Sequence, residues 1–178
     1  MSHFLPTLEL KILARLTGDT GAGGLCNATT PLLVVHPNGS SAGIGVYNTT
    51  PPAVTTAGLS LLPMVTYEIV EVTNDDGFRE KGRPCVVVLH VHVPRSPPTG
   101  YNAMLRGAAI LARIEGDWED QPAGTAPTFG LERFKPDISA ATGWVADIFE
   151  FQGYMTAHDD TAYHWIYTLS IRCSKPGV

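Results

Sequence analysis

The chain has 178 residues, of which 44% are hydrophobic and 16% are charged, and its formal net charge is −5. Lysines and arginines form no cluster beyond the scattered FREKGR at 78–83, whereas a nucleic-acid-binding protein usually neutralises many phosphates with a basic stripe. The composition therefore argues against tight DNA or RNA binding, and the low charge indicates that part of the surface is covered by other subunits.

The first predicted element is an amphipathic helix over residues 5–16. Apolar side chains recur there at intervals of three and four residues, the spacing of one helix face: Leu5, Leu8, Ile12, Leu13 and Leu16. Residues 18–60 differ, because stretches such as GDTGAGG and NTTPPAVTTAG mix small, polar and turn-forming residues. Only 32–35 and 44–47 are apolar, so we predict a long, mostly irregular excursion with one or two short strands.

Two strands joined by a polar connection come next. Residues 63–73 (PMVTYEIVEVT) and 83–93 (RPCVVVLHVHV) are rich in β-branched and aromatic residues, and NDDG at 74–77 supplies turn chemistry between them. We predict a β-hairpin with a charged, protruding loop.

A second helix is predicted over residues 101–118 (YNAMLRGAAILARIEGDW). Many of its apolar residues lie roughly on one side, and its small residues allow close packing on a sheet. The residues on this side are Tyr101, Met104, Leu105, Ala108, Leu111, Ala112 and Trp118.

The remaining sequence returns to strand patterns. Residues 127–139 have room for one short strand, and 143–155 and 161–173 form a second hairpin around TAHDDT. In the last strand Tyr163, Trp165 and Tyr167 share one face. We predict that they are core residues under the second helix, with a contact surface for another subunit as the alternative.

The elements follow the order helix, hairpin, helix, hairpin. This order predicts one α+β domain over residues 1–178, with two helices packed on one face of a mainly antiparallel sheet and with protruding hairpin loops. No apolar run approaches the roughly 20 residues that cross a bilayer, so we expect no contact with a membrane.

The stretch VVVLHVHVP at 86–94 places two histidines on one face of a strand, where His90 and His92 point the same way, as a pair of metal ligands must. A metal site needs a further ligand, and the nearest candidates are His158, Asp159, Asp160 and His164. We predict that the residues of the opposite face lie in the core: Cys85, Val87, Leu89, Val91 and Val93. We favour a half-buried strand face over a metal-dependent enzyme. No nucleophile motif or complete phosphate loop occurs, so we predict no catalytic residue, cofactor or metal.

Several segments carry a resemblance to a known family. They are the helix LKILARLTGD, the segment GVYNTTPP, the strands LPMVTYEIVE and VVVLHVHV, the helix YNAMLRGAAILARIEGDW, and the closing hairpin GWVADIFEFQGYMT…TAYHWIYTLSI. In these segments and in their order the chain resembles the tail terminator (tail completion) proteins of long-tailed bacteriophages. The likeness covers about residues 8–173, and it departs at 21–42, which is longer and richer in glycine.

This resemblance implies a structural protein and not an enzyme. Members of the family look like small α+β subunits that form a hexameric ring, cap the tail tube at its final length and present a surface to the head side. The implied partners are five further copies of the chain, the major tail tube protein and the head-side connector or stopper protein. The implied location is the tail or neck of the virion, assembled in the host cytoplasm. A head-completion or connector protein of the neck is the alternative in the same class.

The resemblance also implies that DNA passes through the lumen of the ring without specific binding. An acidic chain suits such a lumen, because like charge keeps the phosphates from sticking. The contacts with partners would then use charged side chains of the predicted hairpin loop: Asp75, Asp76, Arg79, Glu80, Lys81 and Arg83. The exposed part of the second helix supplies a second set, Arg106, Arg113 and Glu115. For any one of these residues, a merely solvated charge is the alternative.

Overall fold

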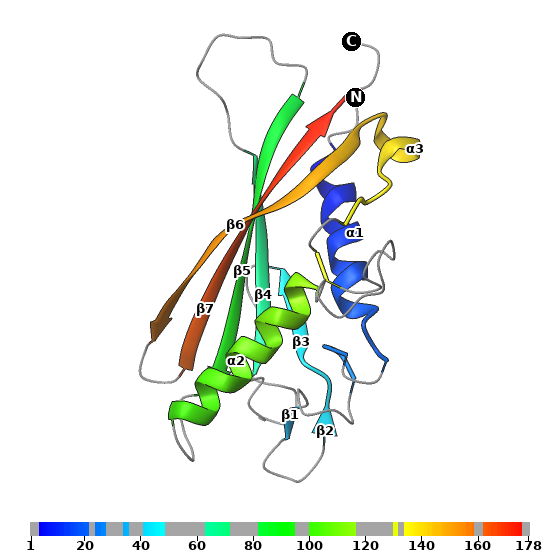
Figure 1. Ribbon diagram of the computed structural model, residues 1–178. Helices are drawn as coiled ribbons and strands as arrows, with labels where there is room; N and C mark the ends of the chain where they lie inside the picture. Colours follow the sequence, from blue (N-terminus) through cyan, green and yellow to red (C-terminus); the bar gives the residue numbers. More distant parts are fainter. Residues whose placement is uncertain are drawn as a thin grey trace, which may run out of the picture.

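In the computed structural model the strands form a twisted sheet, and helices lie on one side of it (Figure 1). The structure describes residues 4–21, 24–27, 34–35, 41–48, 63–71, 82–94, 100–116, 130–131, 134–158 and 162–175. In chain order the elements are α1 (Leu5–Thr17), β1 (Val34–Val35), β2 (Ser41–Ala42), β3 (Gly45–Asn48), β4 (Met64–Glu71), β5 (Gly82–Pro94), α2 (Gly100–Glu115), α3 (Ser139–Thr142), β6 (Val145–His158) and β7 (Ala162–Ser174).

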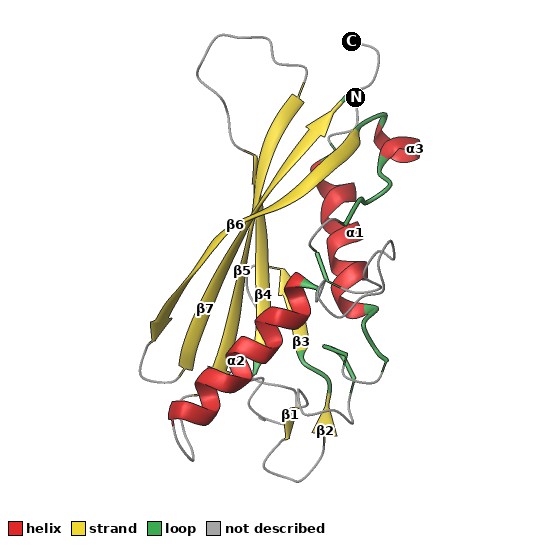
Figure 2. Cartoon of the chain, viewed as in Figure 1, coloured by secondary structure: helices red, strands yellow, loops and turns green. Residues whose placement is uncertain are grey.

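Five of the strands form one sheet in the order β3-β4-β5-β7-β6 (Figure 2). Strand β3 pairs with β4 in parallel, and the other neighbouring strands are antiparallel. Strands β1 and β2 pair with each other in a separate two-stranded sheet. The predicted α+β fold with a mainly antiparallel sheet is confirmed. Short strands do occur at the apolar pieces 32–35 and 44–47 of the segment predicted to be mostly irregular, as β1 and β3, but the parallel pairing of β3 with β4 was not predicted.

The core lies on one face of this sheet. Alternation along β5 buries the predicted core side chains: Cys85, Val87, Leu89, Val91 and Val93. Leu89 has Tyr67 of β4 on one side and Tyr167 of β7 on the other, and all three are buried. Trp165 is also buried and Tyr163 is half-buried, so the prediction that the aromatic face of the last strand belongs to the core is confirmed.

Helix α1 covers part of this face with its predicted apolar side. Leu8, Ile12 and Leu16 are buried in the same cluster as the sheet residues, and Leu5 and Leu13 pack against that cluster. The three- and four-residue spacing read from the sequence therefore identifies the buried side of α1 correctly.

Helix α2 packs on β7 with a different side from the one predicted. Of the predicted side only Leu111 is buried among the described side chains, together with Gly107, Ile110 and Ile114, whereas Met104, Leu105, Ala108 and Ala112 are exposed. Apolar residues occupy both sides of α2, so the pattern does not determine which side is buried. A Cβ atom at Gly107 would lie 2.5 Å from Cε3 of Trp165, so only glycine permits this close approach.

A third helix begins at the end of the segment 127–139, in which one short strand was predicted and of which 127–129 and 132–133 lie outside the described residues. The described residues 130–131 and 134–138 form no strand, and α3 begins at Ser139. Asp137 Oδ1 accepts hydrogen bonds from the backbone N–H of Ser139 at 3.1 Å and from its hydroxyl at 2.7 Å. These bonds satisfy donors at the start of the helix, as short polar side chains commonly do.

Strand β6 is one edge of the sheet and its pairing with β7 is irregular. The register shifts between Ala146 and Ile148 and again between Phe151 and Gly153. Gly153 has a φ of 147°, a conformation that favours glycine. Such bulges bend a strand and increase its twist. The second half of β6, residues 154–158, is exposed.

Candidate interaction surfaces

The predicted charged loop connects β4 with β5. Five of its six candidate residues lie outside the described residues: Asp75, Asp76, Arg79, Glu80 and Lys81. The sixth, Arg83, is a residue of strand β5 and not of a loop. Its Nη1 donates to Oε1 of Glu71 at 2.9 Å, and its Cζ lies 5.5 Å from the ring centre of Trp144. Because half of the Arg83 side chain is exposed, this is a surface ion pair.

The charged residues of α2 do not form the exposed surface that the sequence predicted. Arg106, Arg113 and Glu115 are each half-buried, and burial lowers the pKa of Arg106. The exposed positions within 104–115 are instead apolar: Met104, Leu105, Ala108, Ala109 and Ala112. The charged residues flank this row because the buried residues on the opposite side fix the rotation of the helix.

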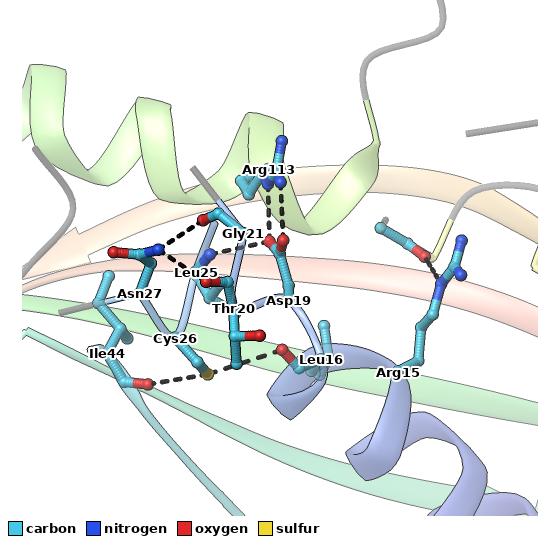
Figure 3. A network of polar contacts seen from close by, with 11 residues as sticks. Arg15, Leu16, Asp19, Thr20, Gly21, Leu25, Cys26, Asn27, Ile44 and Arg113 are labelled. Atoms are coloured by element: carbon cyan, nitrogen blue, oxygen red, sulfur yellow. Dashed lines mark hydrogen bonds and ion pairs between the residues drawn. The ribbon is translucent and has the colours of Figure 1, made fainter. Parts of the chain in front are cut away.

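Arg113 forms an internal ion pair with a residue that the sequence did not single out (Figure 3). Its Nε and Nη2 donate to Oδ2 and Oδ1 of Asp19 at 2.6 and 2.7 Å. Asp19 Oδ2 also accepts the backbone N–H of Leu25 at 2.8 Å. The side chain of Asp19 is only 4% exposed and that of Arg113 is 25% exposed. This pair joins α2 to the segment after α1, so the Arg113 guanidinium serves the fold.

Further polar contacts fix the same segment in place. Asn27 Nδ2 donates to two backbone carbonyl oxygens of residues 20 and 21, at 2.6 and 2.8 Å. Cys26 Sγ lies 3.6 Å from the carbonyl oxygen of Leu16 and 3.4 Å from that of Ile44 (Figure 3). Burial and, second, the Asp19 carboxylate raise the pKa of the Cys26 thiol, which favours its role as a donor. A segment that is glycine-rich in sequence is thus tied to α1, α2 and β3.

Large apolar side chains are exposed on α2 and also on β6. Tyr154 and Met155 are 64% and 61% exposed, and Met104 and Leu105 are 56% and 53% exposed. A hollow at this end of the sheet is lined by Met104 together with residues of β6 and β7: Thr156, Ala157, His158, Tyr163, His164 and Trp165. We call the exposed apolar residues of α2 the apolar surface: Met104, Leu105, Ala108, Ala109 and Ala112.

The two histidines of β5 lie as the strand pattern predicts, on the face opposite the buried valines, and both are half-buried. His164 of β7 is the register partner of His92, with ring centres 4.7 Å apart. His158 instead stacks near Tyr163, with ring centres 6.2 Å apart, and Asp159 and Asp160 lie outside the described residues. Among the described side chains, no group of three His, Cys, Asp or Glu residues is arranged to hold a metal ion.

None of the helices in the described part of the chain is both long and apolar enough to cross a membrane. A comparison with models of known protein families finds no match, and a comparison with curated proteins finds no significant match.

Proposed function

We propose that this chain is a structural subunit of a bacteriophage tail. Six copies form a ring at the head-proximal end of the tail tube, end tail elongation and join the tail to the head-side connector. The chain is then a component of the tail or neck of the virion, assembled in the host cytoplasm, and it is not an enzyme. The sequence segments that resemble tail terminator proteins, and their α+β order of elements, support this proposal.

The apolar surface is the observation that carries the proposal. Two large apolar side chains, Met104 and Leu105, are each more than half exposed on α2, beside the exposed alanines Ala108, Ala109 and Ala112. Soluble monomers rarely expose large contiguous apolar patches, and Met is enriched where proteins contact one another. The alanines of α2 also let a second backbone come close. We assign a second copy of the chain to this surface, in the repeated contact from which a ring is built.

The charge of the chain supports the passage of DNA through the ring. The net charge is −5, so six copies carry a formal charge of about −30, six times the value for one chain. An acidic wall repels phosphates and keeps DNA from binding to it. The major tail tube protein and the head-side connector or stopper protein are the proposed partners at the two ends of the ring.

Sedimentation velocity tests the proposal, with the purified chain alone and with a major tail tube protein from the same genome. We expect a closed species of six subunits in at least one of these samples. Ala108→Glu places a charge in the apolar surface and should abolish that species. Ala14→Glu is the matched control, because Ala14 is also an exposed helical alanine, on α1.

Two results would contradict the proposal. A particle that stays a single copy in both samples argues against a ring. A ring that survives Ala108→Glu, or that is lost equally with Ala14→Glu, argues against the apolar surface as the contact between subunits.

A further inference from the structure

Three imidazoles lie together on the face of the sheet that is opposite the core. His90 and His92 come from β5 and His164 comes from β7. The ring centres of His90 and His92 are 6.0 Å apart and nearly parallel, and those of His92 and His164 are 4.7 Å apart and edge to face. We call these three residues the histidine row. All three are half-buried, although the described helices α1 and α2 pack on the other face.

The strand next to β5 contributes one polar and one acidic group to the row. Thr66 of β4 lies opposite His90 in the register, and its hydroxyl oxygen is 3.0 Å from Nε2 of His92. Glu68, two residues further along β4, is exposed on the same face. Tyr47 of β3 is the register partner of Thr66 and is the titratable group on this face of the edge strand. Glu68 is therefore the acidic group of β4 that faces the row.

The other neighbouring strands bring no further charge close to the row within the described residues. On β6, the register partner of His164 is Ala157, and Met155 lies next on that face. On β7, Arg172 is on the same face but its register partner on β5 is Pro84, at the far end of the strand pair. Three imidazoles thus share a small area in which one carboxylate is the main counter-charge.

This surrounding favours the uncharged form of His90. Burial lowers the pKa of His90, and His164 acts in the same direction, whereas Glu68 opposes both. The ring of His92 lies 6.0 Å from that of His90 and 4.7 Å from that of His164, so a positive charge on one ring disfavours a second positive charge beside it.

We propose that the histidine row is an acid-sensitive switch in the sheet, which keeps β4, β5 and β7 together when it is uncharged and loosens this region when it is protonated. The unfolded chain takes up protons on histidine near pH 6.5, while His90 in the folded chain resists its proton. The contribution of His90 to stability is therefore complete above about pH 6.5 and is lost as the pH falls toward its lower pKa in the folded chain. For each proton that the unfolded chain binds in excess of the folded chain, the folded-to-unfolded ratio falls by up to tenfold as the pH is lowered by one unit. This inference does not depend on the proposed function.

Two measurements on the full chain test the switch, both in the presence of a chelator so that trace metal does not bind. The first is the NMR titration of the histidine ring protons between pH 8 and pH 5. The second is the urea midpoint of unfolding over the same range. We expect the midpoint to fall toward pH 5. In His164→Gln we expect the pKa of His90 to rise, because a neighbouring positive charge is gone, and the fall of the midpoint to become shallower.

His158→Gln is the matched control, because His158 is an exposed histidine that stacks near Tyr163 outside the row. It should leave the titration of His90 and the pH dependence of the midpoint unchanged. The proposal is overturned if His90 titrates identically in the parent chain and in His164→Gln. It is also overturned if His158→Gln removes as much of the pH dependence as His164→Gln does.

Discussion

Replacement of Arg113 by methionine should destabilise the fold strongly. Arg113→Met keeps the aliphatic stem but removes both donors to Asp19, whose side chain is only 4% exposed. The carboxylate then keeps the backbone N–H of Leu25 as its described donor, at 2.8 Å. Breaking a buried ion pair by removing one partner costs about 3–5 kcal/mol, since an uncompensated charge stays buried. For a chain of this length each kcal/mol lowers the melting temperature by about 2–4 °C, so we expect a fall of roughly 6–20 °C.

The reverse replacement, Asp19→Asn, should cost less. Asparagine keeps an oxygen that accepts the N–H of Leu25, and the guanidinium left behind is 25% exposed, so water can reach it. Loss of the charged hydrogen bonds then costs about 1–3 kcal/mol. The double variant should be destabilised by less than the sum of the two single variants, by about 0.5–3 kcal/mol.

Urea unfolding of the four proteins, followed by circular dichroism, measures these differences directly. A cost of Arg113→Met equal to or below that of Asp19→Asn would refute the reasoning, because burial of the carboxylate would then not decide the energy. Exact additivity of the two single variants would refute the direct coupling of the two side chains.

Three further results are expected. Gly107→Ala should destabilise the fold by about 1–3 kcal/mol, because the new methyl group overlaps the ring of Trp165, and a neutral result in urea unfolding would show that α2 can shift away. Arg83→Ala should change the unfolding free energy by less than about 1 kcal/mol, since its pair with Glu71 lies at the surface, and a larger loss would give the pair a structural role. Burial and, second, Glu9 raise the pKa of Tyr67 to about 12, so its stabilising contribution should be complete below about pH 10 and lost as the pH rises through 12. Absorbance at 295 nm, with Tyr67→Phe as the reference, checks this, and ionisation of Tyr67 near pH 10 in the folded chain would contradict it.

The parts of the fold that the sequence predicts best are those with a one-sided apolar pattern. In β5 the valine face is buried and the histidines lie on the other face, because side chains of a strand must alternate. In α1 the buried residues Leu8, Ile12 and Leu16 follow the helical spacing. Local periodicity is sufficient in both elements, since only one side of each is apolar.

Prediction fails where the deciding contact is distant in sequence. Helix α2 is apolar on two sides, and the approach of Gly107 to Trp165, 58 residues later, determines which side is buried. Asp19 lies in a segment with turn composition, and its partner Arg113 is 94 residues away. The position of His164 beside His92 follows from the register of β5 with β7, which the sequence does not specify. The charged residues of α2 were expected at the surface because these distant contacts, which determine the rotation of the helix, are not visible in the sequence.

The irregular pairing of β6 has a consequence for how copies of the chain meet. An edge strand of 14 residues would ordinarily offer a long template to which another strand could add, which leads to runaway aggregation. The shifts at Ala146/Ile148 and Phe151/Gly153 interrupt the regular spacing of backbone donors and acceptors along this edge. An incoming strand would find matching positions over a short stretch only. The irregular edge therefore disfavours open-ended growth of the sheet by strand addition.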